Sequence, residues 1–274
     1  MSSTSKAKST GSKGWKRPPM IENPTHRWAL ILGATAYLIW ALSSVVVEID
    51  LPRLMEGLSR AAEFFAAALQ PDFITRSHDI WIGFVESLTM TVVATTVGIA
   101  LSIPLGLGAA SNLTPRPVYM TCRAILAVAR AFHAIILAVL FVAMFGFGPF
   151  AGFVTLVVAT IGFLGKLIAE DIESINFDTV EAVDATGASW LQKVDFAVAP
   201  QIMPRFIGLS LYRLDINFRE SAIIGIVGAG GIGATLTTAF ERYEFDSVAA
   251  ILLLIIGTVY LFEYVSSAIR SRVM

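Results

Sequence analysis

The sequence predicts an all-α integral membrane protein with six transmembrane helices. The first observation is composition: 55% of the 274 residues are hydrophobic and only 15% are charged, whereas soluble domains average about 45–50% and about 25%. A mean hydropathy of +0.71 agrees with this. The second observation is a series of apolar runs close to the roughly 20 residues that a helix needs to span a bilayer. The third is the uneven distribution of Lys and Arg between the segments that join these runs.

The amino-terminal part divides into a tail, an anchor and a connection. Residues 1–27 are rich in Ser, Thr and Lys, a composition that cannot bury a core, so we expect a disordered basic tail. The apolar run within 28–49 is long enough for an uncleaved transmembrane anchor. In 50–79, apolar residues recur at helical spacing among charged ones. This pattern predicts an amphipathic helix along the membrane surface or against the bundle.

The other five spans lie within residues 80–270, which we interpret as one transmembrane domain. Four of them are clear apolar stretches, at about 81–110, 119–146, 150–170 and 247–268. A fifth, at 201–224, has the length of a span but contains Arg213, Asp215, Arg219 and Glu220. Each such charge costs about 2.5–3.5 kcal/mol at a lipid-exposed helix centre. We therefore expect this span to turn its charged face toward protein or a water-filled cavity.

The distribution of Lys and Arg orients the six spans. With the tail in the cytoplasm, the inside segments are the tail, 111–123, 171–200 and the carboxyl-terminal end, and they hold 11 Lys or Arg. The outside segments are 50–79, 147–149 and 225–246, and they hold 4. Because cytoplasmic loops carry the excess of Lys and Arg, both termini are predicted to be cytoplasmic and the amphipathic connection external.

The cytoplasmic loop at about 171–200 is predicted to form two short helices. Asp178 and Thr179 are candidate N-caps of the first. Gly187 can end that helix, and the second would run from Ser189 toward Pro200. A short helix between two spans can act as a lever, because a partner that binds it moves both spans. An ordinary helical surface loop is the alternative.

This loop resembles the "EAA" loop of ABC importer permeases. Glu181-Ala182, four further residues, Gly187 and the later Pro200 carry the resemblance. The sequence departs conservatively from the family pattern at Val183, Ala197 and Ala199. In that family the loop forms the coupling helix, which sits in a cleft of the ATPase subunit. The resemblance therefore implies ATPase docking by Glu181, Ala182, Val183, Asp184, Ala185, Gly187, Ala188 and Trp190.

Two later blocks resemble permeases of the phosphonate importer family, with similarity from about Glu86 to the carboxyl terminus. One block, from Tyr212 to Ser221, reads YRLDINFRES, and the glycine-rich block that follows reads GIVGAGGIG. The sequence departs from many phosphonate permeases at Arg130-Ala-Phe-His133, where those proteins have a Pro-Glu pair after the Arg. This departure leaves a related substrate, such as phosphite, open.

The charged span is a candidate for the translocation pathway. Asp215 and Arg219 are spaced i, i+4, as are Arg213 and Asn217, so each pair shares a helix face. Guanidinium groups suit a tetrahedral phosphorus oxyanion. An ion-pair network that holds spans together is the alternative, because two acidic residues offset the two cations. The candidate pathway or gate residues are Arg213, Asp215, Asn217, Arg219, Glu220, Gly228, Gly230, Gly231 and His133.

The resemblance implies a methionine-importer-like type I ABC permease core of five helices, to which the anchor is added. The chain would work in the inner or plasma membrane, in contact with lipids, as a homodimer. Its partners would be two ATP-binding ATPase subunits inside and a substrate-binding protein outside. We expect no cofactor in this chain, since ATP and Mg are used by the partner ATPase, and no nucleic-acid partner at a net charge of −1.

Alternatives to phosphonate transport remain at this stage. The same importer class could carry phosphite, hypophosphite, phosphate, methionine or a metal chelate. An intramembrane enzyme belongs to a different class, but there is no HExxH motif, no paired catalytic Asp and no Ser/His constellation. With the single cysteine Cys122 there is also no cysteine-rich metal site. A passive channel would leave the predicted coupling loop unexplained.

Overall fold

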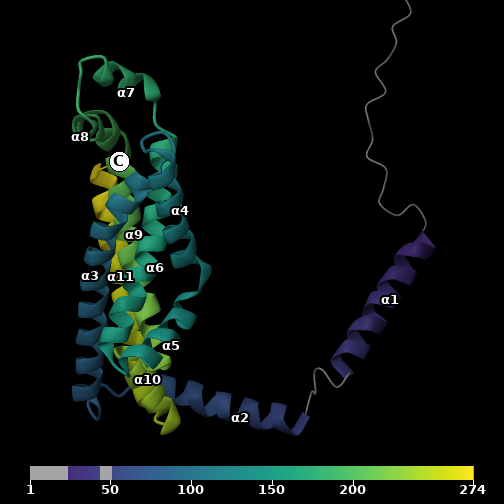
Figure 1. The fold of residues 1–274 in the computed structure, drawn as a ribbon. Helices are drawn as coiled ribbons and strands as arrows, with labels where there is room; N and C mark the ends of the chain where they lie inside the picture. The colour runs from purple at the N-terminus through teal and green to yellow at the C-terminus, as the bar shows by residue number, and fades with distance from the viewer. Residues whose placement is uncertain (1–23, 44–50, 274) are drawn as a thin grey trace, which may run out of the picture. The chain divides into compact units, whose positions relative to one another are not determined.

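The computed structural model describes residues 24–43 and 51–273, and every regular element in these ranges is helical (Figure 1). The chain divides into two compact units, Met1–Ala62 and Glu63–Met274. An all-helical protein was predicted, and the described residues agree with it. Within the predicted tail, residues 1–23 lie outside the described residues, as do residues 44–49 of the predicted anchor.

The first unit contains helix α1 (Pro24–Ser43) and most of α2 (Leu51–Ala68). Helix α1 begins inside the stretch predicted as tail, because a proline is well tolerated in the first turn of a helix. Its large apolar side chains are exposed, including Trp28, Leu32 and Trp40. A surface of this kind suits lipid rather than water. Helix α2 confirms that the connection is helical.

The second unit is built from long helices joined by short turns. Its elements are α3 (Ser77–Gly108), α4 (Arg116–Ala131), α5 (Ala134–Phe145), α6 (Pro149–Glu173), α7 (Phe177–Asp184), α8 (Trp190–Lys193), a π-helical turn (Val194–Val198), α9 (Ala199–Ile226), α10 (Ile232–Glu241) and α11 (Phe245–Val273). Helices α3, α6 and α11 are long and apolar enough to cross a membrane, and the pair α4–α5 makes a fourth if it counts as one span. The predicted count of six also needs α1 and α9 and stays a prediction.

One predicted span is broken. The stretch at 119–146 was predicted as a single span, but α4 and α5 meet at an angle of 91°. Phe132 and His133 both have extended backbone angles, which turns the chain there. His133 was predicted to lie on an apolar helix and instead caps α5, its Nδ1 accepting from the Ile135 N–H at 3.5 Å. Hydropathy does not reveal such a break, because both halves are apolar.

Helix α6 is the centre of the second unit and packs against α3, α4, α5 and α9. Small residues allow close approach along it: Gly98 of α3 lies against Thr160, and Gly165 lies against Leu126 of α4. At one end an apolar cluster joins α6 to the segment that follows it, through Ile172, Val180 and Val198. Within this unit α7, α8 and the carboxyl-terminal end lie at one end of the bundle, and α10 lies at the other (Figure 1).

Candidate coupling segment and charged span

The predicted coupling loop contains two short helices with defined caps. Asn176 caps α7 by accepting from the Asp178 N–H at 3.0 Å, so the predicted caps Asp178 and Thr179 are wrong by two to three residues. Gly187 has φ +77° and ends the first helical segment. Helix α8 begins at a capping box in which the Ser189 N–H donates to the Gln192 side chain at 2.8 Å.

The connection from α8 to the next span is continuous. The π-helical turn Val194–Val198 joins α8 directly to α9. Pro200 already belongs to the first turn of α9, so the loop ends at Val198. At its other boundary, Asp171 and Glu173 belong to α6. The segment between the spans, 174–198, is therefore shorter than the predicted 171–200. We call it the coupling segment.

The proposed docking residues lie on one accessible surface. Glu181, Ala182, Asp184, Ala185, Gly187 and Trp190 are exposed, and Val183 and Ala188 are partly buried. Within α7, Val180 is 6% exposed and packs, together with partly buried Val183, into the apolar cluster at the end of α6. An ion pair of 2.9 Å between Asp184 and Lys193 links α7 to α8. The two short helices thus present their docking residues as one unit.

Polar contacts attach the coupling segment to the spans on either side. The Gln201 side chain of α9 accepts from the Asn176 N–H at 3.0 Å and donates to the Ala197 carbonyl at 2.8 Å. The Ser174 hydroxyl donates to the Asp171 carbonyl of α6 at 2.8 Å, and the pair between Arg205 of α9 and the buried Asp171 carboxylate, at 3.1 Å, ties the two spans to each other beside the segment. A displacement of the segment is therefore resisted by α6 and α9 together, as a lever requires.

A third attachment leads to the corner between α3 and α4, which sequence reasoning missed. The Trp190 indole Nε1–H donates to the Leu113 carbonyl at 3.2 Å. Glu173 fixes the same corner: its carboxylate accepts from the Ser111 N–H and pairs with Arg123, both at 2.8 Å. The coupling segment therefore contacts four of the long helices or their ends. The carbonyl of Leu113 has no signal in sequence, because any residue supplies one.

The charged span divides into two faces. On the first face, Arg213 is 4% exposed, donates to the Thr160 hydroxyl at 3.2 Å and pairs with Glu220 at 3.0 Å. Asn217, fully buried, donates to the hydroxyls of Thr160 at 2.9 Å and Thr95 at 2.7 Å. This buried polar cluster joins α3, α6 and α9. These contacts agree with the alternative interpretation of the charged span, in which a polar network holds the spans together.

The second face carries Asp215 and Arg219, which form the expected i, i+4 ion pair. Arg219 keeps half of its side chain exposed, whereas Asp215 is buried. This pair opens toward α11 rather than toward α3 and α6, since Glu263 and Arg270 of α11 line the same cavity. Two of the four charged residues of the span, Arg213 and Glu220, therefore belong to the cluster that joins helices, and the other two, Asp215 and Arg219, line a cavity.

The glycine-rich block forms a tight turn between α9 and α10. Gly228, Gly230 and Gly231 all have positive φ, at 93°, 76° and 75°. A Cβ on Gly228 would overlap the Phe147 ring. The Gly228 carbonyl accepts from the Gly148 N–H at 3.0 Å, so the turn packs against the one that precedes α6. The glycines permit this approach, as the sequence led us to expect.

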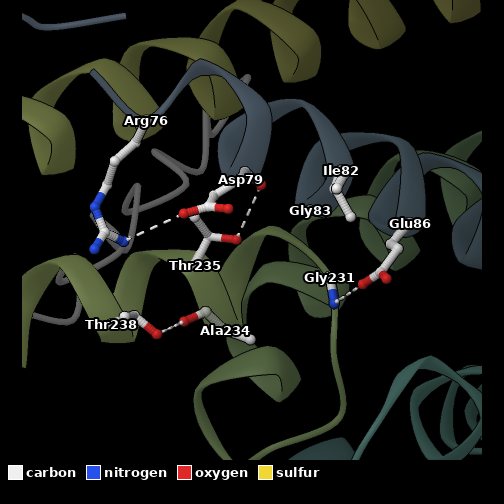
Figure 2. A pocket seen from close by; sticks show the side chains of 9 residues that line it. All are labelled: Arg76, Asp79, Ile82, Gly83, Glu86, Gly231, Ala234, Thr235 and Thr238. Carbon is white, nitrogen blue, oxygen red and sulfur yellow. Dashed lines mark hydrogen bonds and ion pairs between the residues drawn. The ribbon is translucent and has the colours of Figure 1, made fainter. Parts of the chain in front are cut away.

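The start of α10 is held by α3. The Glu86 carboxylate accepts from the Gly231 N–H at 3.1 Å, at the edge of a polar pocket that also contains Arg76, Asp79 and Thr235 (Figure 2). This turn lies apart from the charged span along α9. Among the described residues the His133 side chain forms one hydrogen bond, with the Ile135 N–H, so the predicted pathway residues form three separate groups.

No ligand set for a metal stands out in the described part of the chain, where no group of three or more His, Cys, Asp or Glu is placed to hold an ion. Long apolar helices, a buried polar cluster and an exposed helical lever define a membrane transport permease.

The chain belongs to the family of binding-protein-dependent transport system inner membrane components, which matches residues 102–274. It is accordingly a multi-pass inner-membrane permease of the ABC transporter type. Members of this family are transport subunits, which confirms the prediction that the chain is not itself an enzyme. The region that matches the family contains the coupling segment, since residues 174–198 lie within 102–274.

Several of the relatives are named for the transport of phosphorus compounds. The chain is 38% identical over 259 residues to the phosphate-import permease protein PhnE of Mycolicibacterium smegmatis. The aligned region is 93% of this chain and 49% of that protein. The chain therefore spans about half the length of this relative. It is 34% identical over 246 residues to the phosphite transport system permease protein PtxC of Stutzerimonas stutzeri, covering 89% of this chain and 87% of that one.

Solved structures show the same fold. The MetNI methionine ABC transporter in an inward-facing conformation matches with a TM-score of 0.63 and 26% identity, covering 71% of this chain and 94% of that chain. An amino acid ABC transporter crystallised with histidines matches with a TM-score of 0.61 at 17% identity, covering 73% and 98%. The first match supports the predicted methionine-importer-like core, and the second shows the fold alone.

Proposed function

We propose that this chain forms the translocation pathway of an ABC importer that takes up phosphonates or closely related phosphorus oxyanions. The observation that carries the importer mechanism is the coupling segment, an exposed pair of short helices fixed to α6, α9 and the α3–α4 corner. The substrate class is supported by the relatives, one named for phosphate import and one for phosphite transport. Methionine is less favoured, since the D-methionine permease of Vibrio cholerae is 28% identical to this chain, against 38% and 34% for these two relatives.

The proposed importer complex is built around the coupling segment acting as a lever. A second copy of the chain would complete the pathway, two ATPase subunits would bind the coupling segments, and a substrate-binding protein would deliver ligand on the opposite side. Closure of the ATPases would draw the coupling segments together and tilt α6 and α9 with them. A six-span topology with both termini in the cytoplasm would put the coupling segment on the ATPase side.

Phosphite is the second candidate substrate. The phosphite permease of Stutzerimonas stutzeri matches along most of both chains, and the Arg130–His133 stretch departs from the phosphonate pattern. The substrates are separated by reconstituting the importer and measuring ATPase stimulation by methylphosphonate, phosphite, phosphate and methionine. Stimulation by methionine alone would overturn the assignment to phosphorus oxyanions.

The docking proposal is tested by Glu181→Lys. Reversing an exposed charge in the middle of the docking surface should lower substrate-stimulated ATPase activity about tenfold or more, as expected for loss of an interface contact worth about 2 kcal/mol. Insertion should be normal, because Glu181 is exposed. The matched control is Glu56→Lys on α2, which also reverses an exposed acidic residue. Full stimulation in the Glu181 variant would remove the basis for docking.

A further inference from the structure

A polar cavity lies between α9 and α11, away from the buried polar cluster. It has a volume of about 270 Å³ and is lined by Tyr212, Asp215, Arg219, Glu263, Ser266 and Arg270. Sites for drug-sized ligands usually have about 300–1,000 Å³, so this cavity suits a small organic ion. Asp215 and Arg219 were predicted pathway residues, whereas Glu263 and Arg270 of α11 were not.

The cavity contains both signs of charge, and part of each is unpaired. Arg219 pairs with Asp215. Arg270 donates its Nε–H to the Ser266 carbonyl at 3.4 Å, which leaves its terminal guanidinium nitrogens without a partner among the described residues. Glu263 likewise forms no ion pair or hydrogen bond within the described part of the chain. The cavity therefore offers guanidinium donors and a carboxylate acceptor at once.

This arrangement differs from the buried polar cluster in what it leaves unsatisfied. Around Arg213 the charged side chains pair with each other, so no charge is left for a ligand there, although the Asn217 Oδ1 has no partner among the described residues. Charged side chains inside spans are costly and almost always pair, contact water or mark a functional site. Four ionisable side chains from two helices converge on the cavity, and only one ion pair forms among them. A ligand that pairs with the remaining groups would offset the cost.

We propose that this cavity binds a small zwitterion that carries a phosphorus oxyanion and an ammonium group. Arg219 and Arg270 would donate to the oxyanion, since guanidinium matches tetrahedral oxyanions in a fork. Glu263, with Asp215 beneath it, would accept from the ammonium. A simple phosphonate dianion is a poorer match, because the two carboxylates cancel the field of the two guanidiniums. The ligand chemistry thus follows from the charges of the cavity.

Two sources can supply this chemistry. One is a free aminoalkylphosphonate, and its choice rests on the proposed function. The other is the headgroup of phosphatidylethanolamine, which has the same two groups and would occupy the cavity from the bilayer. The two sources are distinguished by testing soluble ligands on delipidated protein and by identifying lipids that stay bound during purification.

The experiment uses the full chain, purified in detergent and delipidated. Calorimetric titration with 2-aminoethylphosphonate, ethylphosphonate and ethylamine compares the zwitterion with its two halves. We expect 2-aminoethylphosphonate to bind about tenfold more tightly than either, equivalent to one charge-assisted contact of about 1.4 kcal/mol. Equal affinity for 2-aminoethylphosphonate and ethylphosphonate would overturn the proposal, unless native mass spectrometry shows phosphatidylethanolamine bound in preference to phosphatidylglycerol.

Two variants separate the halves of the site. Glu263→Gln should abolish the preference for the zwitterion over ethylphosphonate, or the retention of phosphatidylethanolamine, while oxyanion binding persists and shows that the protein is folded. Arg270→Gln should weaken binding of both phosphonates about tenfold. The matched control Glu170→Gln removes a carboxylate from the Lys166–Glu170 pair of α6 and should change neither. An unchanged preference in Glu263→Gln would overturn the proposal.

Failure of this proposal and failure of the proposed function give different results. If the importer shows phosphonate-stimulated ATPase activity but the permease binds no zwitterion and retains no phosphatidylethanolamine, only the cavity assignment falls. If the cavity binds its ligand as described but no phosphorus compound stimulates the ATPase, only the transported substrate is wrong.

Discussion

Arg213 and Arg219 are the same residue type on one helix, yet their surroundings give them different tasks. Arg213 is almost fully buried and contacts Thr160, Glu220 and the face of the Phe163 ring at 5.5 Å. Arg219 has half of its side chain exposed and a single ion-pair partner. Six residues apart on a helix, they point to different sides. Stability and ligand handling are therefore separable within one span.

Alanine substitutions should separate these two tasks. Arg213→Ala removes a guanidinium that is 4% exposed and pairs with partly buried Glu220, and breaking a buried ion pair costs about 3–5 kcal/mol, so we expect a marked loss of thermal stability and of folded permease. Arg219→Ala removes a half-exposed guanidinium, and the Asp215 carboxylate that it leaves unpaired borders a polar cavity, so we expect a smaller loss of stability and a lower uptake. Thermal unfolding in detergent and uptake into proteoliposomes measure the two effects. Similar stability losses in both variants would contradict this division.

The link between Trp190 and the α3–α4 corner depends on a single donor, the indole N–H. Trp190→Phe removes the indole N–H that donates to the Leu113 carbonyl while keeping an aromatic ring. The bond is worth about 1 kcal/mol. We expect substrate-stimulated ATPase activity to fall several-fold with basal activity retained, because the α3–α4 corner no longer follows the coupling segment. Trp28→Phe on α1 is the control. Unchanged stimulation in Trp190→Phe would show that this corner is not part of the lever.

At the scale of elements, the turn between α7 and α8 depends on the backbone of Gly187. A Cβ there would meet no other atom, so the requirement is its φ of +77° alone. Gly187→Ala should cost about 1–2 kcal/mol and reduce stimulated ATPase activity. Gly187→Asn should be milder, because Asn tolerates the left-handed region. Gly33→Ala in α1 also meets open space and is the control. Equal activity of the Ala and Asn variants would show that the turn geometry is not what limits coupling.

The elements that local sequence determines were predictable, and those that tertiary contacts determine were not. Gly187 and Ser189 signal a turn and a cap through their own chemistry, so the two short helices were predicted correctly. The true cap Asn176 was missed because Asp178 and Thr179 follow it with equal capping ability. The bend at His133 and the partners Thr95 and Thr160 were hidden, since a threonine in an apolar helix usually bonds only its own backbone, as both also do here.

At the scale of the whole permease, the coupling segment and α10 lie at opposite ends of the second unit (Figure 1). A single cysteine in each should therefore label from opposite sides of the membrane. Leu191 and Tyr243 are suitable sites, being 71% and 74% exposed. In a Cys122→Ser background, we expect an impermeant maleimide to label Tyr243→Cys in intact cells and Leu191→Cys only in inverted vesicles. Labelling of both from one side would contradict the proposed topology.

The number of residues around the π-helical turn at Val194–Val198 affects how the docking surface is rotated relative to α9. A π turn holds one residue more than an α turn in the same rise. Each residue of an α-helix advances the chain by about 100°. The π turn therefore takes up one residue with little change of phase, whereas deleting one residue from the α-helical start of α9 would rotate the docking surface by about 100° relative to the rest of that span, with no docking side chain changed. The phase between motor contact and pathway is thus set by a count of residues, and a one-residue deletion should disable a permease whose every contact residue is intact.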